Sequence, residues 1–364
     1  MSVSAFEAIN DALQMNGDLG VEMVPGFSTH WPMASEALIQ LGHPEVVHNW
    51  ASLYSQKRKH LPMPAPFEAI DGNVVDSWRP ALGDFRRAGD WRTYFERRLH
   101  EAPWAEILEV WWPRLLPGMA SGLTHGLLRT MHAVRSIGLA NGRPTRLQLR
   151  ELACGLGYWA SLYVEQPGAH ALLGDSRFPE ILAQIPRIGR DAKIGTRERG
   201  LFLHMPQVAG WAESVGRLAS PEDLQTALSD MTLAFTQVNL VHHREFPIPL
   251  LHTVSAPAAV RVMLDYLPQQ WHIPSYLAVW EGTAAILTNF SPSFKDEETS
   301  NHPPGDAGEE NLTPAILTQH AVAHGDEHAI KFTEACLREY ALRPDSRYLL
   351  APRRVMPKLL RYFR

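Results

Sequence analysis

The chain has 364 residues, 45% of them hydrophobic, which is enough for one large domain or two smaller ones with a substantial core. Its formal net charge is −5, and basic residues are scattered except in the last dozen positions, so we expect no nucleic-acid partner. The N-terminus has no basic segment followed by an apolar block, and no stretch approaches about 18 uninterrupted apolar residues. We therefore expect a cytoplasmic protein with no membrane partner.

Apolar residues recur at spacings of three and four through nearly every segment, which predicts an all-α fold. The first clear helix covers about 32–41 and ends at Gly42. Residues 90–140 read as two or three helices, and an unusually apolar helix over about 146–164 is expected at the centre of the bundle. The breaks in 90–140 are expected at Pro103, Pro113 and Pro117.

Three helices and a loop are predicted in the second half. Ser220 as N-cap with Pro221 at the first helical position predicts a helix to Leu240. The next helix either runs through His252 or starts after Ser255, and another covers 271–287. Residues 291–314 are polar, acidic and rich in proline and glycine, which predicts a flexible loop or lid. We expect one domain over 1–364.

Motifs for the common cofactors are absent from the sequence. The stretch GLGYWA at 155–160 fits the GxGxxA form of the dinucleotide fingerprint, but it lies inside a helical pattern and follows no strand. No phosphate-binding Gly-Lys-Ser/Thr, no GxSxG and no HExxH occurs. The two cysteines, Cys154 and Cys336, lie in apolar helical patterns and are expected to be buried thiols.

The chain has 17 histidines, and histidine is the commonest nitrogen ligand of transition metals. His30 precedes an amphipathic helix, and His125 lies among small residues that let backbones pack closely. His132 follows two helical turns after His125 on roughly the same face, and His252 is enclosed by apolar and small residues. Taken singly, each of these histidines could equally be a surface or packing residue.

The stretch HGDEHAIKFTEACLREYA at 324–341 combines histidines, acids and a lysine at a helix start. With Asp326 as N-cap, His328 takes the second helical position, and Lys331, three residues on, shares its face. The solvated face is expected to carry Glu327, Glu334 and Arg338. A buried lysine tends to lose its charge, and a neutral amine can add carbon dioxide to form a carbamate, which is an anionic metal ligand. The alternative is a surface lysine whose ammonium reaches water.

Four stretches occur in one order over about residues 20–345: HWPMASEALIQLG, PGMASGLTHGLLRTMHAVR, LLHTVSAPAAVR and DEHAIKFTEAC. Together they resemble the questin oxidase-like family. The resemblance implies an oxygenase that opens anthraquinone-type rings in aromatic polyketide metabolism. Members are described either as NADPH-linked Baeyer–Villiger-type enzymes or as non-haem iron dioxygenases.

In the iron-dependent form, the resemblance implies four histidines and an N-carboxylated lysine as ligands. Carried onto this sequence, the Fe²⁺ ligands are His30, His125, His252, His328 and Lys331, with His324 as an alternative to His328. His132 or Arg129 would order the carbamate by a hydrogen bond. The implied partners are dioxygen and a flat aromatic substrate, for which tryptophan and phenylalanine side chains could line a pocket. NADPH would be a reductant without a nucleotide motif. The alternatives are an iron-free NADPH-dependent monooxygenase and a non-catalytic helical binding protein.

Overall fold

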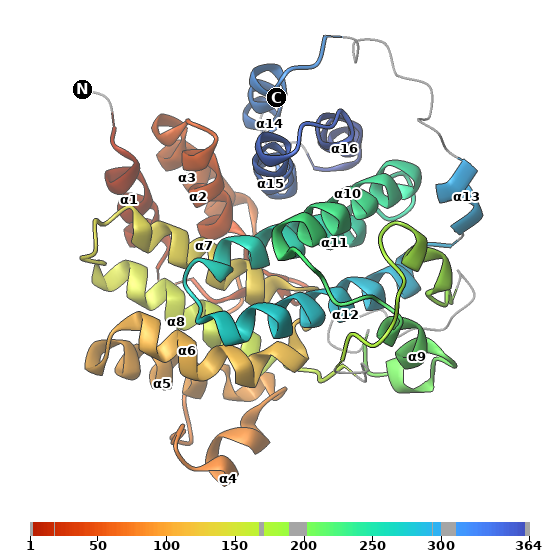
Figure 1. The fold of residues 1–364 in the computed structure, drawn as a ribbon. Helices are drawn as coiled ribbons and strands as arrows, with labels where there is room; N and C mark the ends of the chain where they lie inside the picture. Colours follow the sequence, from red (N-terminus) through yellow and green to blue (C-terminus); the bar gives the residue numbers. More distant parts are fainter. Residues whose placement is uncertain are drawn as a thin grey trace. The chain divides into compact units, whose positions relative to one another are not determined.

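The computed structural model describes residues 3–17, 19–166, 171–188, 202–292, 294–299 and 311–360. It is mostly helical, which confirms the predicted all-α fold (Figure 1). The chain divides into two compact units, which we call unit 1 (Met1–Glu165 and Tyr266–Pro268) and unit 2 (Gln166–Asp265 and Gln269–Arg364). The single domain over 1–364 stays a prediction.

Unit 1 consists of helices and one small antiparallel hairpin, in which Glu22 lies opposite Ser28. Helix α8 packs against α1, α5, α6 and α7, which confirms its predicted central place within this unit. Its elements are α1 (Ala5–Asn16), β1 (Glu22–Met23), β2 (Phe27–Ser28), α2 (Trp31–Gln40), α3 (Val47–Lys57), α4 (Val75–Trp78), α5 (Ala88–Glu101), α6 (Trp104–Leu115), α7 (His125–Gly138) and α8 (Arg146–Ser161).

The predicted helix ends of unit 1 are mostly right. Helix α2 ends just before Gly42, whose φ of +87° suits a residue without a Cβ. The break at Pro113 is wrong, because this proline lies in the last turn of α6. A proline there removes one hydrogen bond of the helix without preventing the preceding turns from forming. The chain leaves the helix three residues later, in the 3-10 turn Leu116–Gly118.

Helices α7 and α8 approach closely at glycines. A Cβ on Gly126 would lie 2.4 Å from the Cβ of Trp159, and a Cβ on Gly155 would lie 3.0 Å from the Cα of Thr130. The glycines of the GLGYWA stretch lie within α8 and allow other helices to pack closely against it. They do not form a phosphate-binding loop at the end of a strand. The small residues around His125 allow this close contact, as predicted.

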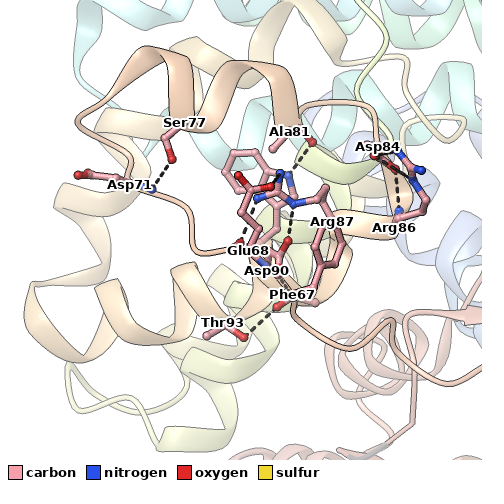
Figure 2. Close-up of polar contacts among 12 residues, drawn as sticks. Phe67, Glu68, Asp71, Ser77, Ala81, Asp84, Arg86, Arg87, Asp90 and Thr93 are labelled. Carbon is pink, nitrogen blue, oxygen red and sulfur yellow. Dashed lines mark hydrogen bonds and ion pairs between the residues drawn. The ribbon is translucent and has the colours of Figure 1, made fainter.

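The segment before α4 lies over the start of α5 and is held by one buried carboxylate (Figure 2). Asp90 accepts hydrogen bonds from the backbone N–H of Phe67 at 2.7 Å and of Glu68 at 3.2 Å, and it pairs with Arg87. The Arg87 guanidinium also lies 5.1 Å from the centre of the Phe67 ring. Gly89 permits this approach, because a Cβ there would lie 2.0 Å from the Pro64 carbonyl oxygen.

Unit 2 is built around α10 and α11, which lie side by side (Figure 1). Helix α11 also packs against α12 and α15, and α15 packs against α14 and α16. Its helices are α9 (Trp211–Gly216), α10 (Leu224–His242), α11 (Pro247–Leu264), α12 (His272–Phe290), α13 (Phe294–Thr299), α14 (Pro314–His324), α15 (Glu327–Leu342) and α16 (Arg347–Val355).

Two expectations for unit 2 are resolved by α10 and α11. The predicted N-cap Ser220 is wrong, because Asp223 caps α10 by accepting the N–H of Thr226 at 2.8 Å. Helix α11 runs through His252, which decides between the two predicted starts. Among the described helices, α11 is long and apolar enough to cross a membrane, but 78% of that window is buried, as in the core helix of a soluble protein.

The predicted loop 291–314 is partly wrong, because α13 lies within it. Glu297 in α13 is buried and accepts hydrogen bonds from Arg187 at 3.0 and 3.1 Å and from Ser291. His242 lies 3.1 Å from the same carboxylate. Residues 293 and 300–310 of the predicted loop lie outside the described residues.

Candidate metal centre

His30 and His125 meet in the interior of unit 1. Their Nε2 atoms are 3.0 Å apart, and both side chains are only 2% exposed. Two imidazole nitrogens at about 2.1 Å from one metal ion and at a right angle to each other would be about 3.0 Å apart. The spacing of this histidine pair is therefore that of two neighbouring ligands of an octahedral ion.

A left-handed turn sets the orientation of His125. Gly122, Leu123 and Thr124 have φ values of +54°, +54° and +63°, although leucine and threonine rarely adopt this conformation. The turn brings the Gly122 carbonyl oxygen to 2.6 Å from Nδ1 of His125. Since a carbonyl only accepts, Nδ1 carries the proton, and the Nε2 lone pair of His125 faces His30.

Side-chain contacts also connect α2 and α7, the helices that begin at the two histidines. Glu36 in α2 lies 2.6 Å from Nδ1 of His132 and 3.1 Å from Nε of Arg135, both in α7. His30 and His125 precede these contacts by similar lengths of helix, so α2 and α7 run parallel with their N-termini together. His132 thus has a carboxylate partner in its own unit, and its predicted bond to a carbamate stays a prediction.

Arg129 is tied to the chain next to His30. Its guanidinium donates two hydrogen bonds to Glu151, at 2.7 and 2.9 Å, and one to Oγ1 of Thr29 at 3.1 Å. The His30 N–H donates to the hydroxyl of Tyr54 at 2.9 Å. These contacts fix the backbone on which His30 stands, and the predicted role of Arg129 as donor to a carbamate stays a prediction.

In unit 2, Asp326 caps α15 as predicted and also holds an imidazole. Its Oδ1 accepts the backbone N–H groups of His328 at 2.8 Å and Ala329 at 3.3 Å. Nδ1 of His328 lies 3.3 Å from the same oxygen. Burial alone raises the pKa of Asp326, but the hydrogen bonds from His328 and the helix N–H groups outweigh it and hold the pKa below the ordinary value. An imidazole bonded through Nδ1 presents Nε2 to a metal.

His324 and His328 differ in the hydrogen bonds of Nδ1. The Asp326 N–H donates to Nδ1 of His324 at 3.4 Å, so this nitrogen accepts and Nε2 of His324 carries the proton. His328 has the opposite arrangement, with Nδ1 directed at the Asp326 carboxylate and Nε2 unprotonated. The geometry therefore favours His328 over His324 as the fourth imidazole.

Lys331 is buried, as predicted for an inward-facing residue of α15. Its side chain is buried with a residue exposure of 5%, and desolvation lowers its pKa from 10.5 to about 8, although Glu327 and Asp326 oppose this. The neutral amine, which is the form that adds carbon dioxide, is therefore much more populated near neutral pH than in an exposed lysine.

The predicted solvated face of α15 is wrong. Glu327 is fully buried and Glu334 is 5% exposed, whereas Arg338 is half-buried and donates to the Ala258 carbonyl of α11 at 2.7 Å. A ligand atom of Glu327 lies within 4.8 Å of one of His328. Glu327 is thus a candidate metal ligand that the sequence did not predict. The only sequence feature that could have indicated it is its position next to the predicted ligand His328.

His252 is fully buried in α11, the helix that packs against α15. A second buried link holds these helices, because Arg261 of α11 donates to both carboxylate oxygens of Glu339 in α15 at 3.0 Å. His252 on α11 and Lys331 on α15 thus lie on two helices of unit 2 that pack together and share an ion pair.

The aromatic side chains expected around a substrate mostly form core. The fully buried tryptophans pack into unit interiors, with Trp91 and Trp111 in edge contact at 5.2 Å between ring centres. They are Trp31, Trp91, Trp111, Trp112, Trp159, Trp211 and Trp280.

Within unit 1 the structure brings His30 and His125 together, and within unit 2 it gathers Asp326, Glu327 and His328 at the start of α15. The complete five-residue ligand set stays a prediction. No protein-family model matches the chain, and no curated protein matches it either.

Proposed function

We propose that this protein is a cytoplasmic non-haem iron-dependent oxygenase. It would insert oxygen into, or cleave, a C–C bond of an aromatic or quinone substrate. The observation that carries this proposal is the 3.0 Å separation of the Nε2 atoms of His30 and His125, with the Nδ1 proton of His125 committed to the Gly122 carbonyl. A histidine that merely fills a core has no need of a strained turn to direct its unprotonated nitrogen toward a second imidazole.

The available donors fit a ferrous ion. Imidazole nitrogens suit iron, and one anionic oxygen lowers the net charge of the site. We propose His30, His125, His252, His328 and carboxylated Lys331 as the ligands. Iron, when bound, supplies the redox chemistry that activates dioxygen. The buried carboxylate of Glu327 is a second source of anionic oxygen.

The residues around the proposed ligands fix their tautomers and directions. The Gly122 carbonyl holds the proton of His125 on Nδ1, and Asp326 does the same for His328. Arg129 holds Thr29, and through it the backbone of His30. Burial keeps the amine of Lys331 partly neutral, which permits a carbamate to form.

Metal content tests the proposal directly. Protein purified without oxygen and given Fe²⁺ should retain about one iron per chain after desalting. His125→Ala and His328→Ala should each lower iron affinity at least 10-fold, the range seen when a metal site loses an ordering contact. His48→Ala is the matched control, because His48 is exposed and pairs with Asp11. Equal iron retention by His125→Ala and wild type would refute the proposal.

The carbamate is tested separately with ¹³C-labelled bicarbonate. Wild-type protein should give a carbamate ¹³C resonance that Lys331→Met lacks. If iron binds without this resonance, Glu327 becomes the candidate for the anionic ligand. Glu327→Gln should then lower iron affinity. Substrate-dependent NADPH consumption by iron-free protein would support the monooxygenase alternative.

A further inference from the structure

A pocket of about 300 Å³ opens between α5 and α8 of unit 1, away from the chemistry proposed above. Three of its seven lining residues are arginines. The lining residues are Arg92, Glu96, His100, Arg146, Leu147, Leu149 and Arg150.

Helical spacing places these side chains along the pocket. Arg92, Glu96 and His100 follow one another at intervals of four on α5, so they share one face of that helix. Arg146 and Arg150 have the same interval on α8, which packs against α5. The groove is thus bordered by a charged row on each side.

The one carboxylate in the pocket, Glu96, makes only long contacts with two of its arginines. Oε1 of Glu96 lies 3.6 Å from Nε of Arg92 and 3.5 Å from Nε of Arg150, which is too long for good hydrogen bonds. Nε of Arg92 is buried and has no hydrogen-bond partner among the described residues. The Arg92 guanidinium therefore has donor capacity left for an acceptor in this pocket.

The charge of the pocket runs against that of the chain. Three arginines and one glutamate give a net charge of +2 with neutral His100, whereas the whole chain carries −5. Arg146 and Leu147 are also the first two residues of α8, a helix of 16 residues, and first-turn N–H groups have no acceptor within their own helix. Each of these features favours an anion.

We propose that this pocket binds the phosphate monoester group of a soluble small molecule. A phosphate monoester carries about −1.5 to −2 at neutral pH, which matches the local +2, whereas a carboxylate carries only −1. Arginine pairs with phosphate through two parallel hydrogen bonds, which two arginines on facing helices can supply together. A volume of about 300 Å³ holds one such group with a few neighbouring atoms and is too small for a nucleic-acid strand.

Calorimetric titration of the full-length protein with inorganic phosphate tests the proposal. We expect saturable binding at one site per chain, weakened 10-fold or more by Arg92→Gln or Arg146→Gln, because a hydrogen bond to a charged group contributes that much. Arg98→Gln is the matched control, since Arg98 is on α5, lies outside the pocket and pairs with Glu101. Equal weakening by the control, or no saturable binding to wild type, would overturn the proposal.

Glu96→Gln gives a second test, in which the affinity for phosphate is expected to rise. This variant removes the carboxylate that competes with phosphate, so binding should tighten at least 3-fold, whereas Glu101→Gln should leave it unchanged. Unchanged or weaker binding by Glu96→Gln would contradict the proposal. Vesicles containing phosphatidic acid form the last arm, and binding to them without binding of free phosphate would show a membrane ligand and overturn the assignment.

Discussion

Replacing Lys331 by methionine in metal-free protein should remove a pH dependence of stability that a buried amine creates. Burial lowers the pKa of Lys331 from 10.5 to about 8 in the folded protein, while the unfolded chain keeps the ordinary value. Below about pH 8 both states bind the proton, and the folded state bears the full cost of a buried charge. Between about pH 8 and 10.5 only the unfolded state binds it, so the free energy of unfolding rises with pH. The difference corresponds to at most about 3 kcal/mol.

Urea unfolding followed by circular dichroism, in buffer free of bicarbonate, measures this effect. Lys331→Met should be more stable than wild type by up to about 3 kcal/mol near pH 7, and the gap should close as the pH approaches 10. Taking the difference between the two proteins cancels the other groups that titrate in this range. Lys358→Met is the control, because Lys358 is exposed and should give a constant difference. A constant difference for Lys331→Met as well would mean that its pKa is ordinary, and the carbamate would lose its basis.

Two further substitutions test the interior of unit 1. Glu151→Gln removes the charge that pairs with the buried guanidinium of Arg129 and should lower the free energy of unfolding in urea by about 3–5 kcal/mol. The double variant Arg129→Met, Glu151→Leu should recover most of this loss. A loss below about 1 kcal/mol for Glu151→Gln would mean that the pair is solvated. Gly126→Ala should destabilise by about 1–3 kcal/mol despite the better helix propensity of alanine, because its Cβ would meet Trp159. Gly138→Ala, where the nearest atom is 3.8 Å away, should be neutral or stabilising in the same measurement.

The helices were predictable from the sequence because apolar spacing and end signals agree for most of them. Gly42 and Asp326 marked helix ends correctly, since each acts through its own backbone or side chain. Ser220 failed as the N-cap of α10 because a second capping residue, Asp223, follows three positions later and the chain used that one. Local signals compete when they are this close, and only packing decides between them.

The site was predictable where helical spacing alone fixes the answer. Asp326, His328 and Lys331 have the predicted positions on α15. Glu327 was assigned to solvent because spacing gives the angle between side chains but not the number of neighbouring helices, and α15 packs against α11, α14 and α16. The left-handed turn before His125 was equally hidden, since Leu123 and Thr124 do not favour that conformation.

The parallel arrangement of α2 and α7 bears on the charge that the histidine pair can accept. Both helices present their N-termini, the positive ends of their dipoles, at His30 and His125. This field opposes additional positive charge at the two imidazoles. The same field also disfavours a bare dication, which neutral imidazoles cannot offset. The iron proposed for this pair is therefore expected to bind more tightly when its ligand shell includes an anionic oxygen.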